Sequence, residues 1–304
     1  MISKYTYKTL TWIDLSSPTK EEVRALSEEY KVPELVRDEI LTPTLRSKVD
    51  LYDNLIFLIL HFPILPASRP GQNIEQEIDF VIGKNFIITT HYEPIPPLEE
   101  FAKMFDKGSA LEKRNLSEHA GFLFYFIMKE LYRYSMTELD KVNESLHQIE
   151  TKIFEGHEAE MVEKMSSVNR ILIDYKQALR FHREVLLSFE GAATDFFGAH
   201  FAYYLSSIIG EYNKVQSILD GHREILGDLR ETNDSLLTTK TNDTIKKLTI
   251  MTFIILPLTF ITGVFGMNME MIFISSTADF VKVISAMLII ALAMFVYFKG
   301  KKWF

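Results

Sequence analysis

The pattern of hydrophobic and polar positions divides the chain into three stretches. In residues 1–97, short apolar runs rich in β-branched and aromatic residues alternate with segments of helical spacing. This alternation predicts a small α/β domain. We expect its strands at residues 10–15, 55–62, 78–83 and 85–91, and its helices at residues 18–30 and 34–41.

Long amphipathic helices are predicted over residues 98–247. Nine of the ten prolines come before this stretch and the tenth, Pro257, comes after it, so no helix here bears the ~3 kcal/mol cost of an internal proline. We expect a helical hairpin of residues 116–154 and 161–189, joined by an acidic tip, and then a long stalk helix from Phe201. The stalk runs without a stop signal into the apolar region, and its apolar stripe needs partners, which we expect from neighbouring subunits.

Two uncharged runs close the chain. The first, residues 248–269, has 22 residues without a charge and as a helix spans about 33 Å, enough to cross a bilayer. The second, residues 283–298, has 16 residues and is extended to residue 280 if Lys282 snorkels to the headgroups. The alternative for each run is a buried helix of a soluble core. We expect a membrane part at residues 248–304, with transmembrane helices at about 248–268 and 280–298.

Basic residues predict how these helices are oriented. Three lysines precede the first run and three follow the second, which places both chain termini on the cytoplasmic side of a cell membrane. The N-terminus has the pattern of neither a secretory signal nor a transit segment. The outer loop has two charges, Glu270 and Asp279. The flanking lysines are Lys240, Lys246 and Lys247, and Lys299, Lys301 and Lys302.

Composition removes several kinds of chemistry. The chain of 304 residues has no cysteine, which excludes disulfides, thiolate zinc sites and cysteine nucleophiles. Its formal net charge of −8 argues against nucleic acid and favours a cationic partner. The phosphate-loop, dinucleotide, serine-hydrolase and HExxH zinc patterns are all missing. We therefore expect neither an enzyme nor an organic cofactor.

The tripeptide Gly266-Met267-Asn268 lies at the outer end of the first apolar run. Glycine and asparagine end helices, and around an axis of several copies the carboxamide oxygens of Asn268 would ring the mouth of a pore. A hydrated divalent cation suits such a ring, because Mg²⁺ gives up its water reluctantly and is held through that water by oxygen atoms. The alternative interpretation is an ordinary helix C-cap.

In this position the tripeptide resembles the signature of the CorA family of magnesium transporters. The resemblance covers the whole chain. It implies a CorA-like homopentameric funnel, in which an α+β cytoplasmic domain is followed by a long helical stalk and two C-terminal transmembrane helices, the first lining the pore. Further segments that carry it are residues 33–41, 230–237, 241–250, 256–260 and 301–303.

A pore face follows when helical spacing is applied to the first span. The resemblance implies a polar ring of Asn242 at the cytosolic end, hydrophobic constrictions at Leu248 and Leu256, and outer polar rings at Thr259 and Asn268. Ordinary helix packing in the bilayer is the alternative for the same residues. The full face comprises Asn242, Ile245, Leu248 or Thr249, Thr252, Leu256, Thr259 and Gly263, and the outer pore comprises Gly266, Met267, Asn268 and Glu270.

The resemblance also implies a regulatory divalent site between neighbouring subunits. Its acids correspond to Glu39 and Glu231, where the best-known pattern has aspartates; the alternative is a pair of solvated carboxylates. A basic ring near the inner pore mouth is expected from Lys299, Lys301 and Lys302. The sequence departs from the family at Phe265, usually tyrosine, and in the outer loop after Asn268.

These features predict a channel-type divalent cation transporter, mainly for Mg²⁺ uptake, with Co²⁺ and Ni²⁺ as further substrates and cytosolic Mg²⁺ as the gating ligand. Moving a doubly charged ion inward through 100 mV releases roughly 4.6 kcal/mol, so the membrane potential is a sufficient driving force. One alternative is a zinc transporter of the same superfamily, although that branch typically departs at the position of Met267. The other is a non-conducting, membrane-anchored sensor or scaffold.

Overall fold

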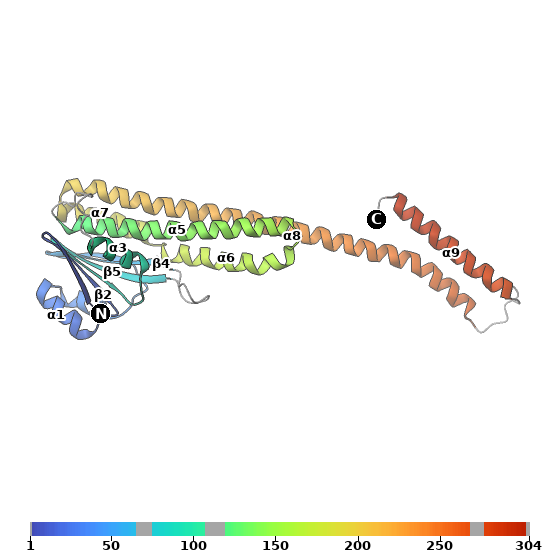
Figure 1. Ribbon diagram of the computed structural model, residues 1–304, viewed down its shortest axis with the longest axis horizontal. Coiled ribbons are helices and arrows are strands. Elements are labelled where there is room, and N and C mark those ends of the chain that lie inside the picture. Colours follow the sequence, from blue (N-terminus) through green and yellow to red (C-terminus); the bar gives the residue numbers. More distant parts are fainter. Residues whose placement is uncertain (1, 65–74, 107–118, 268–276, 302–304) are drawn as a thin grey trace. The chain divides into compact units, whose positions relative to one another are not determined.

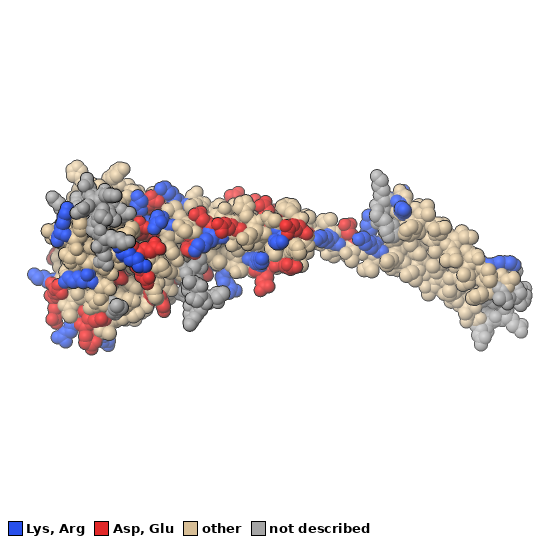
Figure 2. Space-filling model, in the orientation of Figure 1, with Lys and Arg blue, Asp and Glu red and all other residues tan. Residues whose placement is uncertain are grey.

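The computed structural model describes residues 2–64, 75–106, 119–267 and 277–301 (Figure 1). The chain forms two compact units, Met1–Leu229 and Arg230–Phe304. Charged side chains crowd the first unit, whereas the apolar stretches of the second show an uncharged surface with basic side chains at their ends (Figure 2). Each unit is described separately below.

A six-stranded sheet in the order β1-β2-β6-β5-β4-β3 organises the first unit. The pair β2 and β6 is parallel, and the other neighbouring strands are antiparallel. Both faces of β4 and β5 are buried, which explains their nearly continuous apolar sequences. The strands are β1 (Ile2–Tyr7), β2 (Leu10–Ser16), β3 (Lys48–Leu51), β4 (Leu55–Pro63), β5 (Glu75–Gly83) and β6 (Phe86–His91).

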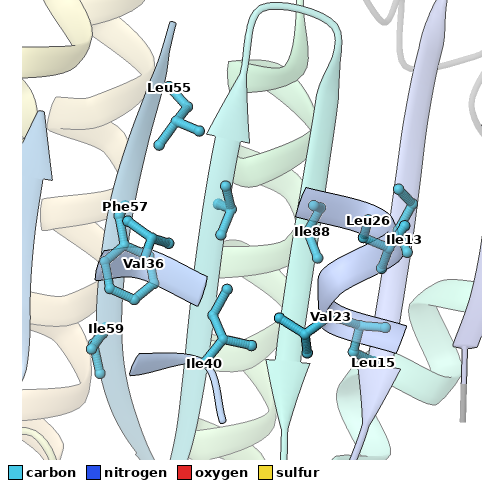
Figure 3. Close-up of a cluster of buried hydrophobic side chains, with 11 residues drawn as sticks. Ile13, Leu15, Val23, Leu26, Val36, Ile40, Leu55, Phe57, Ile59 and Ile88 are labelled. Atoms are coloured by element: carbon cyan, nitrogen blue, oxygen red, sulfur yellow. The ribbon is translucent and has the colours of Figure 1, made fainter. Parts of the chain in front are cut away.

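Helices α1 (Lys20–Tyr30) and α2 (Glu34–Glu39) cover one face of this sheet. The capping box of Thr19 and Glu22 starts α1 by satisfying backbone N–H groups at the helix end. Figure 3 shows Val23 and Leu26 of α1 and Val36 of α2 over the strands. The buried cluster that results comprises Ile13, Leu15, Val23, Leu26, Val36, Ile40, Leu55, Phe57, Ile59, Val81 and Ile88.

The opposite face is covered by helices that follow the sheet in sequence. Ring contacts join Trp12 to Phe101 of α3 and Phe80 to Phe124 of α5, each at 5.3 Å between centroids. Helices α6 and α7 also contact β4, and the start of α8 runs beside α5 (Figure 1). These helices are α3 (Pro96–Asp106), α5 (Ala120–Phe154), α6 (Glu158–Ala178), α7 (His182–Phe197) and α8 (Ala202–Phe265).

The single helix predicted over residues 161–189 is wrong, because the chain breaks between α6 and α7. Just after the break, His182 is fully buried; its Nε2–H donates to the His61 carbonyl at 2.7 Å and its Nδ1 accepts from the Tyr132 hydroxyl at 2.8 Å. Burial lowers the pKa of His182 to about 3, so the ring is neutral at physiological pH. The turn therefore places a neutral histidine where it joins the helices to the sheet.

In the described residues, the second unit consists of the C-terminal part of α8 and of helix α9. The long helix α8 continues unbroken to Phe265, and α9 (Thr277–Gly300) follows it. In the described residues, α8 and α9 each contain a stretch long and apolar enough to cross a membrane. The stalk predicted from Phe201 and the two predicted spans therefore correspond to two helices.

Candidate functional site

The predicted pore face lies on one continuous helix, α8, and all of its residues except Thr249 are exposed. The side chains of Ile245, Leu248 and Leu256 are 54%, 59% and 64% exposed, and Asn242 and Thr252 are exposed as well. Such a row of exposed apolar residues has no place in water and requires either lipid or further protein around it. Thr259 and Gly263 continue the exposed row, while Thr249 at its edge is half-buried.

The other side of α8 is shielded within the second unit. Ile250 is fully buried, and Ile254, Pro257, Leu258 and Ile261 are half-buried. At 100° per residue, this shielded side is centred about 180° from the row formed by Ile245, Leu248, Thr252, Leu256, Thr259 and Gly263.

Helix α9 supplies the covering surface. The rings of Phe253 and Phe298 approach to 6.4 Å between centroids, and α9 carries half-buried residues at helical spacing. Because α9 packs on the shielded side, the predicted pore face points away from it. The half-buried residues of α9 are Val283, Met287, Ala291, Met294 and Phe298.

Threonine hydroxyls give the exposed row its polar atoms. The hydroxyl of Thr252 donates to the Leu248 carbonyl and that of Thr259 to the Ile255 carbonyl, both at 3.0 Å. Each hydroxyl oxygen keeps lone pairs that can accept further hydrogen bonds. A hydrated cation presents outward-pointing O–H donors, so this surface can receive the ion with its water shell.

The helix ends where the glycine of the signature begins. The Gly266 amide donates to the Thr262 carbonyl at 2.8 Å, and a Cβ on Gly266 would lie 3.0 Å from that same carbonyl oxygen. A larger residue would crowd this turn. Met267 is 57% exposed, whereas the predicted outer-pore residues Asn268 and Glu270 lie outside the described residues.

The first predicted regulatory acid, Glu39, is the last residue of α2 and forms an ion pair. The Lys48 ammonium lies 2.6 Å from Glu39 Oε2 and 2.6 Å from Asp50 Oδ2. Partial burial of Lys48 favours the neutral amine, but its hydrogen bonds to Asp50 and Glu39 outweigh this and raise the pKa of Lys48. Sequence reasoning missed this lysine, although the alternation Lys48-Val49-Asp50 is a signal for two charges on one strand face.

The second acid, Glu231, is exposed on the part of α8 that belongs to the second unit. Within the described residues of one chain, no group of three or more histidines and acids gathers as a metal site. The regulatory site of Glu39 and Glu231 between neighbouring subunits is implied by the family resemblance, and it stays a prediction. Of the predicted basic ring, Lys299 and Lys301 are exposed near the end of α9, and Lys302 lies outside the described residues.

Comparison with known proteins found a matching family model, sequence relatives and solved structures of similar fold. The family model described as CorA-like Mg²⁺ transporter protein matches residues 7–301. A cobalt/magnesium transport protein CorA from Thermotoga maritima is 26% identical over 300 residues, which is 97% of this chain and 84% of the relative. The complete CorA magnesium transporter structure from Methanocaldococcus jannaschii has a TM-score of 0.82 at 22% identity, covering 97% of this chain and 92% of that one.

A cytoplasmic domain of another name has a similar fold. The cytoplasmic domain of ZntB from Vibrio parahaemolyticus matches with a TM-score of 0.61 at 14% identity, over 77% of this chain and 88% of that one. The full-length matches confirm the family resemblance and the predicted fold of the single chain, whereas the predicted pentamer stays a prediction. The chain therefore belongs to the CorA-like Mg²⁺ transporter family and is a divalent metal transporter with a soluble α/β domain, one long helix and two apolar C-terminal helices.

Proposed function

We propose that this protein conducts hydrated Mg²⁺ into the cytosol along the exposed face of α8. The observation that carries the proposal is the position of the row containing Leu248, Leu256 and Thr259, on the opposite side of α8 from the surface that packs on α9. A row that mixes apolar and hydroxyl side chains suits a narrow aqueous path around an axis of several copies. Co²⁺ and Ni²⁺, similar in charge, are further expected substrates.

Assembly is needed to make this path. In one copy, Ile245, Leu248 and Leu256 are more than half exposed, and surrounding an axis with copies of α8 buries them against one another. The family resemblance implies five copies. Closed rotational symmetry then turns each residue of the row into a ring.

Chemistry along the path follows from the type of side chain in each ring. Hydroxyl oxygens of Thr252 and Thr259 accept hydrogen bonds from the water shell of the ion, and so does the carboxamide oxygen of Asn268 at the outer mouth. Because these groups are neutral, they hold the ion weakly enough for it to leave. The rings of Leu248 and Leu256 offer no acceptor, and a narrow apolar ring expels water and blocks the ion.

Gating is proposed to depend on Glu39 and Glu231. Both are carboxylates, the oxygen donors that Mg²⁺ prefers, and both are partly or fully exposed. A bound divalent cation there would neutralise the repulsion between acids of neighbouring subunits. Without that cation, Glu39 keeps only its ion pair with Lys48, and the remaining repulsion between the acids loosens the assembly and lets the Leu248 and Leu256 rings widen.

The direction of flow follows from the charges at the ends of the apolar helices. Lysines precede the apolar part of α8 and follow that of α9, which favours cytoplasmic positions for both termini. An inside-negative potential then draws a divalent cation inward with roughly 4.6 kcal/mol per 100 mV. Lys299, Lys301 and Lys302 would form a basic ring at the inner mouth.

Uptake into liposomes tests the proposal. Purified protein is reconstituted, a potassium diffusion potential is imposed, and Mg²⁺ entry is followed with an internal dye. We expect uptake that increases with the inside-negative potential and is unchanged by a pH gradient. Zinc uptake that responds to a pH gradient, without Mg²⁺ uptake, would support the zinc transporter; no flux from a correctly assembled protein would support a scaffold.

A further inference from the structure

The strand register places Lys48 and Asp50 on the face of the sheet that α2 covers. Lys48 pairs with Ile59, and Asp50 pairs with Phe57, and directly opposite residues of antiparallel strands share a face. Ile59 and Phe57 belong to the cluster beneath α1 and α2. The side chains of Lys48 and Asp50 therefore point toward the end of α2, where Glu39 lies.

At that end Lys48 is held by several contacts. Its ammonium is 2.6 Å and 2.9 Å from the two carboxylate oxygens of Glu39, 2.6 Å from Asp50 Oδ2, and 5.3 Å from the centroid of the Phe57 ring. Contact with both oxygens of Glu39 occupies the carboxylate edge that a divalent cation would use. In the described part of the chain, Lys48 is the cation that Glu39 contacts.

The ion pair can be opened by a competitor. The side chains of Lys48, Glu39 and Asp50 are 33%, 40% and 39% exposed, and ion pairs that water reaches are weak because solvent screens them. A divalent cation brings twice the charge of an ammonium ion to the same oxygens. Displacement of Lys48 by such an ion needs no unfolding of α2 or β3.

Further acids lie on the same face of the sheet. Asp79 pairs with Ile59 on the side away from Lys48 and is fully buried. Two residues before it in β5, Glu77 accepts a hydrogen bond from the Thr44 amide at 2.5 Å. Burial raises the pKa of Asp79 well above its ordinary value and favours the neutral carboxyl, so the negative charges in contact with Lys48 are those of Glu39 and Asp50. Loss of the ammonium ion would leave Glu39 and Asp50 uncompensated and would increase their attraction for any other cation.

We propose that Lys48 is a tethered competitor that occupies Glu39 and must be displaced before a divalent cation binds there. The inference rests on the regulatory role proposed for Glu39. It assigns Lys48 a specific task, which is to weaken divalent binding at Glu39 and so raise the Mg²⁺ concentration at which the transporter responds. A lysine with only a structural task would lower stability when replaced and leave that concentration unchanged.

The increase in Tm that Mg²⁺ causes in the full-length protein in detergent tests this inference, because it measures binding independently of transport. The midpoint, the Mg²⁺ concentration that gives half of the maximal Tm increase, is compared between wild type and Lys48→Gln, with Lys48→Met as a second neutral variant. We expect the midpoint to fall about fivefold in both, the upper value for loss of one partly exposed ion pair. Lys48→Arg, which keeps the charge, should resemble wild type, as should Lys164→Gln, which removes an exposed lysine from α6.

The double variant Glu39→Gln/Lys48→Gln shows whether the tighter Mg²⁺ binding acts through Glu39. In this variant we expect no fivefold decrease of the midpoint. An unchanged or higher midpoint in both neutral Lys48 variants would overturn the inference, as would a decrease that persists without Glu39. Mg²⁺ uptake with an unchanged midpoint would remove only this inference, whereas a lowered midpoint in a protein without uptake would remove only the proposed transport.

Discussion

Replacing Asn268 by alanine is expected to reduce potential-driven Mg²⁺ uptake about a hundredfold, because each subunit loses one acceptor worth about 0.5–1.5 kcal/mol and the losses add around the axis. The prediction rests on sequence position. Asn268 directly follows Met267, where the described segment that contains α8 ends. With alanine, the hydrated ion meets an apolar ring at the outer mouth and is not captured. Initial rates of Mg²⁺ entry into liposomes measure the loss.

Thr262→Ala is the matched control. Thr262 lies six residues before Asn268 in the sequence. It is outside the predicted pore face, and its hydroxyl donates to the Thr259 carbonyl within α8. Uptake by this variant should stay within about twofold of wild type, since loss of an exposed helix hydroxyl is worth little. Normal uptake by Asn268→Ala would show that the signature is a helix cap and does not select the ion.

A polar residue at Leu256 should hold the transporter open. The Leu256→Asn change places carboxamides in a ring that the proposal describes as dry, and a wetted ring no longer blocks the ion. We expect Mg²⁺ uptake at inhibitory internal Mg²⁺ to increase about tenfold, equivalent to about 1.4 kcal/mol of lost barrier. Leu256 is 64% exposed in one copy, so the change should not disturb the packing of α8 on α9.

Leu256→Ile keeps the ring apolar and should retain inhibition by internal Mg²⁺. The comparison is made in liposomes loaded with high and low Mg²⁺ and subjected to the same potential. If Leu256→Asn stays closed at high internal Mg²⁺, the constriction lies elsewhere, and Leu248 becomes the next residue to test by the same pair of substitutions.

The long-range organisation could be predicted because its signals are long and consistent. An uncharged run of 22 residues and a proline-free stretch before it predict one continuous helix, and α8 extends over 64 residues. Strands β4, β5 and β6 were also predictable, because buried strands require apolar side chains on both faces. In each case burial or the membrane imposes a composition that the sequence must show.

Short or exposed elements could not be predicted in the same way. Strand β1 has half its residues exposed and β3 has four residues, so their hydrogen-bonded neighbours determine them more than their own sequences do. Helix α3 did carry a usable signal, Pro96 and Pro97 at its first positions followed by Glu99. The break between α6 and α7 has neither proline nor glycine, and His182, the first residue of α7, is buried directly after it.

The candidate site also has a part that the sequence predicted and a part that it did not. The spacing on α8 predicted the pore face, because a helix converts residue number directly into direction. The ion pair of Lys48 and Glu39 joins a strand to a helix that is separate in sequence, and its existence depends on the register of β3 against β4. Sequence spacing alone gives no such register. The family resemblance therefore pointed to Glu39 but not to Lys48.

Single cysteines on opposite sides of α8 test the central claim most directly. The chain has no native cysteine, so Thr259→Cys and Ile261→Cys each introduce one thiol, and the two positions are about 200° apart on the helix. A membrane-impermeant cationic thiol reagent should abolish Mg²⁺ uptake through Thr259→Cys and leave Ile261→Cys unaffected. Block at Ile261→Cys with continued uptake through modified Thr259→Cys would place the ion path on another face and contradict the account.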